Sequence, residues 1–321
     1  MVYKEVLFGA LPDGTDLHCL FGPPVSHLHA WSADGTAILS EATPQASLLT
    51  GDAQSYAYAS PTDGPQALTR PQATGVYIVT GDGSIDQFTF VGTSRIQIAT
   101  GIGAKDVAVS PDGATLAVTS ANSSRTGVVL MNNDGSNQRE LVTVPTVASG
   151  NQTSFAGLGP LVWLSATSVA YLQAPPGTKS GPFALNVVDT TTGKVLSTAV
   201  VGADIHQGAS TALVADGAMV ATEFGSCSSQ IAPTVYDTSG PTPTGIKVPV
   251  PTAYSFAAPI GWLPDHTLVM LAKASSCAGP GDVLLWKMGS AATQLYASGA
   301  TEAAVRAPGS VFEPGALSSG S

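Results

Sequence analysis

Five polar side chains interrupt apolar strand patterns near the points where strands should end: Glu41, Thr119, Gln173, Glu223 and Lys273. Glu41 and Glu223 are far apart along the chain and could face each other across a groove. Two carboxylates placed in this way can divide general-acid and general-base work between them. A simpler interpretation is that strands become polar where they reach water. The sequence leaves both interpretations open.

Three histidines fall near the same strand ends. His27 and His29 are two residues apart and so lie on one side of a strand, and His206 is expected in the equivalent entry loop before another strand. Neutral imidazole suits zinc, iron or copper. No HExxH or CxxC spacing accompanies these histidines, so we predict no metal and no cofactor. His18 and His266 fall in hairpins and are expected to be structural.

Short β-hairpins are the elements that would position these residues. Residues 105–120 read KDVAVSPDGATLAVTS, in which two apolar runs flank a turn at 110–113. Pro111 presets a backbone angle of that turn, and Gly113 accepts the positive φ that follows. Related hairpins have turns at 32–35, 215–217 and 264–266, and looser copies lie around 162–165 and 304–312. Such recurrence predicts a repeat architecture.

A second type of hairpin follows each of these, with turns at 62–64, 133–135, 191–193, 238–240 and 288–290. The chain starts on a second hairpin, around 12–14, and ends on a first one. We therefore predict an all-β propeller in which residues 2–22 and 301–316 combine into one closing blade, which removes exposed sheet edges. Counting 75–99 as an irregular blade gives seven blades of about 46 residues, and six is the alternative. The propeller forms one domain, residues 1–321.

Two stretches of nine residues carry a resemblance to a known family. WSADGTAIL at 31–39 and VSPDGATLA at 109–117 resemble the W-S-P-D-G repeat of TolB-like β-propellers, a WD40-like type of repeat. The resemblance implies a propeller over essentially the whole chain. It implies little about activity, because related propellers include partner-binding proteins, lyases, peptidases and sensors.

The connections divide the two faces of the expected disc. The hairpin turns are short, whereas the connections at 41–55, 143–158, 173–182, 201–209, 224–232 and 273–282 are long and should emerge together around the channel mouth. Long loops on a rigid scaffold often carry function. We therefore expect the ligand site on this face, among His27, His29, Glu41, Gln173, His206, Glu223 and Lys273.

Two of the three cysteines fall in equivalent loops. Cys227 and Cys277 are 50 residues apart, close to one blade repeat. Equivalent loops of adjacent blades are neighbours, so this pair could reach the separation that a disulfide needs. The bridge would indicate an oxidising compartment. Cys19 is expected to remain a buried free thiol.

The composition excludes some classes of partner. Charged residues make up 11% of the chain, with 22 acidic against 12 basic. No basic cluster exists, so we expect no nucleic-acid partner. The apolar runs have strand length, so we expect no membrane span. The low charge favours an exported protein, extracellular or periplasmic, whose signal or anchor has been removed; a cytoplasmic protein is the alternative.

The leading hypothesis is an exported, monomeric binding module that recognises a protein or glycan on the long-loop face. An alternative is a propeller hydrolase or lyase that acts on a glycan or ester with Glu41 and Glu223 at the channel mouth. A third is a structural domain of a larger surface protein. The sequence favours a binding protein over an enzyme without deciding between them.

Overall fold

The computed structural model describes the backbone at residues 7–9, 18–21, 27–31, 37–42, 45–50, 55–59, 64, 66–70, 72, 74–89, 94–121, 126–144, 147–149, 152–154, 158–174, 180–206, 210–225, 232–274 and 279–305. Side chains are described from residue 64 onward within these ranges, except at 147–149, 152–154, 180–181, 202–206, 210–211 and 224–225.

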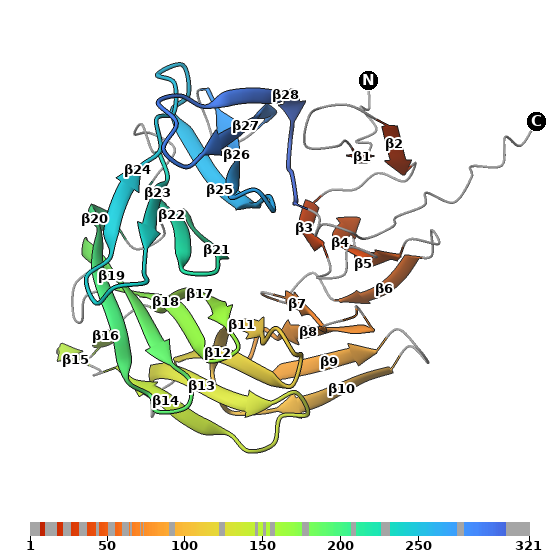
Figure 1. The fold of residues 1–321 in the computed structure, drawn as a ribbon. Coiled ribbons are helices and arrows are strands. Elements are labelled where there is room, and N and C mark those ends of the chain that lie inside the picture. Colours follow the sequence, from red (N-terminus) through yellow and green to blue (C-terminus); the bar gives the residue numbers. More distant parts are fainter. Residues whose placement is uncertain are drawn as a thin grey trace, which may run out of the picture.

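The described residues form six four-stranded antiparallel sheets, arranged around a common axis (Figure 1). We number these sheets as blades 1 to 6 in chain order. Blade 1 holds β3 (His27–Trp31), β4 (Ala37–Ala42), β5 (Gln45–Thr50) and β6 (Ser55–Ala59). Blade 2 holds β7 (Gln66–Leu68), β8 (Gly75–Val79), β9 (Ile85–Thr89) and β10 (Ser94–Ala99). Blade 3 holds β11 (Ala104–Val109), β12 (Thr115–Ala121), β13 (Thr126–Asn132) and β14 (Arg139–Thr143).

Blades 4 to 6 repeat this pattern. Blade 4 holds β17 (Leu158–Ser165), β18 (Ser168–Gln173), β19 (Ser180–Asp189) and β20 (Val195–His206). Blade 5 holds β21 (Ser210–Asp216), β22 (Met219–Gly225), β23 (Thr234–Asp237) and β24 (Thr244–Lys247). Blade 6 holds β25 (Phe256–Trp262), β26 (Thr267–Lys273), β27 (Gly281–Lys287) and β28 (Gln294–Ala300). Two separate hairpins are β1 (Leu7–Gly9) with β2 (His18–Phe21), and β15 (Val147–Ser149) with β16 (Gln152–Ser154).

Each blade is built from strands in simple sequence order, and its first strand lies nearest the axis (Figure 1). First strands of successive blades are neighbours, as in β11 with β17, β17 with β21, and β21 with β25. The all-β propeller predicted from the hairpin repeat is therefore confirmed.

Part of the predicted closing blade lies outside the described residues. Figure 1 draws the β1–β2 hairpin in the space between blade 6 and blade 1. Residues 301–305 form no strand, but a Cβ placed on Gly261 of β25 would lie 3.0 Å from the Val305 side chain. That contact places residue 305 beside the first strand of blade 6. The pairing of 2–22 with 301–316, and with it the seventh blade, stays a prediction.

Two sequence assignments near the N-terminus were wrong. Residues 66–99 form a complete four-stranded blade, not an irregular one that begins at 75. Residues 45–50 of the long connection expected at 41–55 form β5, which pairs with β4 and β6, so the second hairpin of blade 1 is β5 with β6 and not a hairpin around 62–64. Strand β7 has only three residues, too few to show an alternating pattern that would reveal it in the sequence.

The hydrophobic core lies between the blades in the part of the chain with described side chains. Leu116 and Val118 of blade 3 pack against blade 2, whereas Ala117, between them, packs against blade 4. Alternate side chains of a strand point to opposite faces, so each sheet contributes to two apolar layers. This alternation decides which neighbour each later residue faces.

Hydrogen bonds between the first strands of neighbouring blades add to the inter-blade contacts. Trp163 Nε1 donates to the carbonyl of Ala108 in the preceding blade at 3.1 Å, and Trp262 Nε1 donates to Val214 at 3.5 Å. These two bonds join equivalent positions one blade apart. Gly113 has φ +76°, and a Cβ there would lie 1.9 Å from the Arg70 carbonyl oxygen, so both the turn and its close approach to blade 2 require glycine.

Candidate functional site

The strand pairing places three of the five polar strand-end residues at one equivalent position. The reference position is the residue that follows the acceptor of the inter-blade tryptophan bond in blades 3 and 5, and its counterpart Trp31 in blade 1. Its second-strand partners give the pairs Trp31 with Ile38, Val109 with Leu116, and Ala215 with Val220. Counting three residues on gives Glu41, Thr119 and Glu223. Aligning hairpins by their turns therefore identified a real structural position in blades 1, 3 and 5.

Gln173 and Lys273 do not share this position. Val169 and Leu268 are the corresponding partners in blades 4 and 6, so Gln173 lies one residue too far and Lys273 two. Gln173 also faces the preceding blade, because Tyr171 on the same side packs there. The residues paired at the reference position are six positions apart in blades 4 and 6 but seven apart in blades 1 and 3, so counting from the turn does not reach the same position.

Glu223 is buried between blades 5 and 6. It lies on the same side of β22 as Ala221, which packs against blade 6, and only 1% of Glu223 is exposed. Both carboxyl oxygens lack a hydrogen-bond partner among the described residues. Burial raises the pKa of Glu223 to about 8, so this carboxyl is largely protonated at neutral pH.

Asp106 is an acid that the sequence did not single out. It lies opposite Thr119, on the face of blade 3 that meets blade 4. The backbone N–H of Leu161 in blade 4 donates to Oδ2 of Asp106 at 3.1 Å, and the N–H of Val107 donates to Oδ1 at 2.9 Å. Burial raises the pKa of Asp106 to about 6, against the lowering effect of these hydrogen bonds. The only sequence signal is an acid inside the apolar run KDVAV.

Gln173 belongs to a chain of polar side chains across blade 4. Its Oε1 accepts from Asn186 Nδ2 at 3.3 Å, and Asn186 Oδ1 accepts from Thr198 at 3.0 Å. The three residues lie on β18, β19 and β20. Lys273, at the end of β26, is half-buried, and its carbonyl accepts the N–H of Ser255 at 3.0 Å. Both lie at the end of the blades where the long connections leave.

The histidine and cysteine predictions fall largely outside the described side chains. His27 and His29 lie on β3, where His27 pairs directly with Glu41. His206 ends β20 opposite Ser180, and so lies in a strand instead of an entry loop. The side chain of Cys19 on β2 and the whole of Cys227 and Cys277 lie outside the described residues. Where side chains are described, no three His, Cys, Asp or Glu gather as metal ligands would.

His266 lies in a hairpin turn with φ +62°, and its Nδ1 pairs with a carboxylate oxygen of Asp216 in the equivalent turn of blade 5. This contact links the turns of two neighbouring blades.

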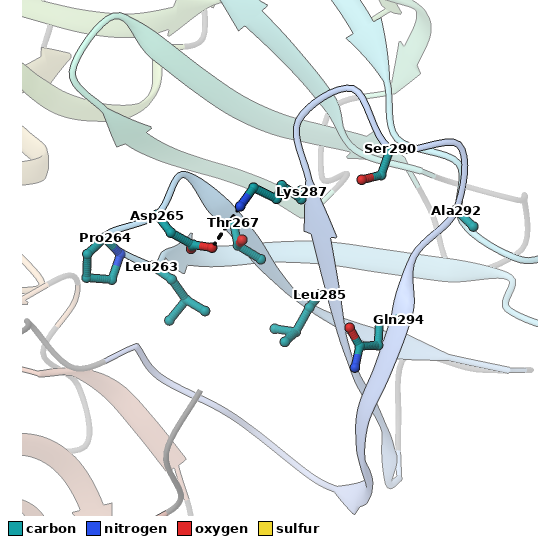
Figure 2. Close-up of a pocket in the computed structure, with 9 residues that line it drawn as sticks. All are labelled: Leu263, Pro264, Asp265, Thr267, Leu285, Lys287, Ser290, Ala292 and Gln294. Atoms are coloured by element: carbon teal, nitrogen blue, oxygen red, sulfur yellow. Dashed lines mark hydrogen bonds and ion pairs between the residues drawn. The ribbon is translucent and has the colours of Figure 1, made fainter. Parts of the chain in front are cut away.

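A cavity of about 580 Å³ lies at the short-turn end of blade 6, away from the face expected to bind (Figure 2). Its lining comes from the turn before β26, from β27 and from the segment leading into β28: Leu263, Pro264, Asp265, Thr267, Leu285, Lys287, Ser290, Ala292 and Gln294. Lys287 Nζ lies 3.4 Å from an oxygen of Asp265, and both side chains are mostly exposed.

The cavity faces away from blade 5. Leu284 and Trp286, on either side of Leu285, pack against blade 5, so Leu285 points to the other side of blade 6. Gly261, next to Val305, belongs to the same sheet. The cavity therefore opens on the flank of blade 6 where the closing segment of the ring is expected.

No family model and no curated protein matches this chain. Solved structures do match. The β-propeller domain of Cps50 (Swd1) from Myceliophteria thermophila has a TM-score of 0.60 at 9% identity, with 87% of each chain covered. An oligogalacturonate lyase from Vibrio parahaemolyticus has a TM-score of 0.56 at 11% identity, covering 91% of this chain and 85% of the lyase.

A chain of a nidogen/laminin complex has a TM-score of 0.52 at 11% identity, covering 83% of this chain and 94% of the other. TolB structures also match, at TM-scores of 0.48. At these identities the three likenesses with TM-scores above 0.5 show the propeller fold and leave the activity open. No helix among the described residues is long and apolar enough to cross a membrane.

Proposed function

We propose that this chain is a propeller binding module that holds a partner protein at the end of the blades where the long connections leave. The observation that carries the proposal is the extra backbone at that end of blade 4. The β15–β16 hairpin is inserted between the end of β14 and the start of β17. Strands β19 and β20 pair as far as Ser180 with His206, well past the last pair of β18 with β19, Gln173 with Ala184.

A propeller does not need this extra backbone, because at the opposite end strands are joined by turns as short as 166–167 in blade 4 and 217–218 in blade 5. Elaborated loops on a rigid scaffold are where binding surfaces usually form. Gln173 and His206 lie at the elaborated end. Of the remaining residues, His27, His29, Glu41 and Lys273 belong to the corresponding strand ends of blades 1 and 6 and stay in the proposed site, whereas Glu223 of blade 5 is buried and contributes no direct contact.

The burial of Glu223 makes the enzyme alternative less well supported. General acid–base catalysis requires both carboxylates to reach the substrate. The Glu223 carboxyl points into the layer between blades 5 and 6 and is 1% exposed. A groove with Glu41 and Glu223 on opposite walls therefore lacks one of its two acids.

The proposal is tested with a phage library of random 12-residue peptides, panned on the purified protein, with binding of selected peptides measured by calorimetry. In the test variant, residues 147–154 are replaced by a Gly-Ser linker. In the control, Asp134→Ala alters an exposed turn at the opposite end of blade 3. We expect the linker variant to weaken binding by about tenfold or more and the control to leave it unchanged. If only Asp134→Ala abolishes binding, the site lies at the short-turn end of the blades, and the proposal is contradicted. A parallel glycan array distinguishes a glycan ligand from a protein one.

Export of the protein is part of the same proposal and depends on the cysteines. We expect mass spectrometry of the unreduced protein to show one disulfide, between Cys227 and Cys277, and one free thiol at Cys19. Three free thiols would contradict both the bridge and the oxidising compartment.

A further inference from the structure

The outer strand of blade 4, β20, exposes apolar side chains to solvent. Val200 is 74% exposed, and Val195 and Leu196 are 47% and 44% exposed. Ala199 and Val201, on the other side of the strand, are buried against blade 5. One side of β20 therefore holds the blade in place, while the other side presents Leu196, Thr198 and Val200 outward.

The backbone edge of β20 is open along the same stretch. In the described part of the chain β20 forms a ladder with β19 alone. Pairing with β19 runs without a register shift from Phe183 with Val201 to Val187 with Ser197. The outward N–H and C=O groups of residues 197–201 thus form a regular strand edge that no described strand occupies, and such an edge is a template for another strand.

The outer strands of blades 2, 3 and 5 carry charges that hinder strand addition. Strand β10 contains Arg95, which forms an ion pair with Asp86 at 2.6 Å. Strand β14 begins with Arg139 and Glu140, and β24 ends with Lys247. Charged side chains of this kind protect edges from pairing. The outer strands of blades 1 and 6, β6 and β28, are uncharged like β20, but register shifts leave no more than three consecutive pairs in their ladders, against five in that of β20. Residues 195–203 of β20 contain neither a charge nor a proline.

We propose that β20 takes up an extended, uncharged segment of the partner protein as a fifth strand of blade 4, paired with residues 197–201. In this mode backbone hydrogen bonds supply affinity, and alternate side chains supply specificity. Apolar β-branched residues of the added strand would lie beside Leu196 and Val200, the arrangement that stabilises neighbouring strands. This inference rests on the proposed function, because it assigns the chemistry of the partner that blade 4 holds.

The charge of the chain favours a partner protein over a second copy. The formal net charge is −10 at pH 7, so two copies repel each other on approach. A neutral or basic partner segment meets no such barrier. The uncharged edge also predicts that binding depends only weakly on salt.

The probe is a synthetic peptide of alternating valine and threonine with one lysine at each end, and its control has prolines at two central positions. We measure binding by calorimetry and amide hydrogen exchange of residues 195–201. The test variant is V200K. The matched control, I246K, places the same charge on the exposed face of β24, where Ile246 is 43% exposed.

We expect the valine–threonine peptide to bind and to slow exchange at 195–201. V200K should weaken binding by about tenfold, I246K should not, and the proline peptide should not bind. The inference is overturned if V200K and I246K behave alike, or if protection falls outside β20. It is also overturned if light scattering shows a dimer that V200K dissociates, because the occupant is then a second copy.

Failure here is distinguishable from failure of the proposed function. If library-selected peptides depend on residues 147–154 but are unaffected by V200K, blade 4 binds a partner without strand addition. If no library peptide binds while the valine–threonine peptide still protects β20, the binding end was wrongly chosen and the strand edge stands.

Discussion

Two of the layers between blades each bury an acidic side chain at an equivalent depth, and the two side chains differ in their hydrogen-bond partners. Between blades 3 and 4, Asp106 on the first strand accepts two backbone N–H groups, one of them from Leu161 across the interface. Between blades 5 and 6, Glu223 on the second strand has no partner among the described residues. The positions are directly related, because Asp106 pairs with Thr119, the equivalent of Glu223.

The difference comes from the backbone of the following blade. In blade 4 a register shift between Leu158 and Leu161 interrupts the ladder of β17 with β18. The N–H of Leu161 is therefore directed to Asp106 instead of β18. Glu223 meets a layer of apolar side chains that includes Ala257, Met270 and Ala272. Lys273 lies on the other side of β26, because Ala272 beside it faces blade 5. A buried acid is thus accommodated as an ion where the backbone offers donors and as a neutral carboxyl where it does not.

The largest expected effect is on the pH dependence of stability. The pKa of Glu223 is about 8 in the folded chain against an ordinary 4.5. Between these values the folded chain holds a proton that the unfolded chain has released, so its stabilising contribution is complete below pH 4.5 and is lost as the pH rises through 8. From pH 5 to 8, the wild type should lose up to about 4 kcal/mol relative to Glu223→Leu. Urea unfolding at each pH measures this.

A control and a refinement accompany that experiment. Glu140→Gln, an exposed acid on β14, should leave the slope unchanged. Asp106 should add a smaller slope of the same sign, confined to about pH 4–6, because burial raises its pKa from 3.8 to about 6. If the free energy of unfolding changes with pH in the same way for wild type and Glu223→Leu, the Glu223 carboxyl is hydrated or paired.

The next effect concerns the acid that is hydrogen-bonded. Asp106→Ala leaves two backbone N–H groups without an acceptor at the interface of blades 3 and 4. We expect the free energy of unfolding at pH 7.5 to fall by about 2–3 kcal/mol. Asp106→Asn, which keeps one acceptor oxygen, should recover part of the loss. Equal stability of Asp106→Ala and wild type would mean that the cost of burying the carboxylate cancels its hydrogen bonds.

The smallest expected effect concerns Thr119, the uncharged residue at the position that Glu41 and Glu223 share. Thr119 is fully buried, and its hydroxyl lacks a partner among the described residues. Thr119→Val keeps the shape and removes the unpaired hydroxyl, so stability should rise by less than about 1 kcal/mol. Thermal unfolding checks this. A loss of stability would reveal a hydrogen bond of Thr119.

The sequence determined the propeller and the repeated hairpins because a short turn between two apolar runs is a local signal. The turn at 110–113 and Gly113 with φ +76° follow directly from the residues SPDG. The alignment of hairpins also found the shared position of Glu41, Thr119 and Glu223. It failed for Gln173 and Lys273, because the turns of blades 4 and 6 hold one residue fewer between the strand residues paired at the reference position than those of blades 1 and 3.

Only the tertiary structure decided what that position faces. Glu223 and a solvent-exposed glutamate look alike in a strand pattern, and the layer between two blades is formed by residues about 50 positions apart. Asp106 was overlooked for the same reason, since its partner Leu161 lies 55 residues away. Local sequence fixes which side of a strand a residue occupies, whereas its hydrogen-bond partners and its pKa depend on the neighbouring blade that packs against that side.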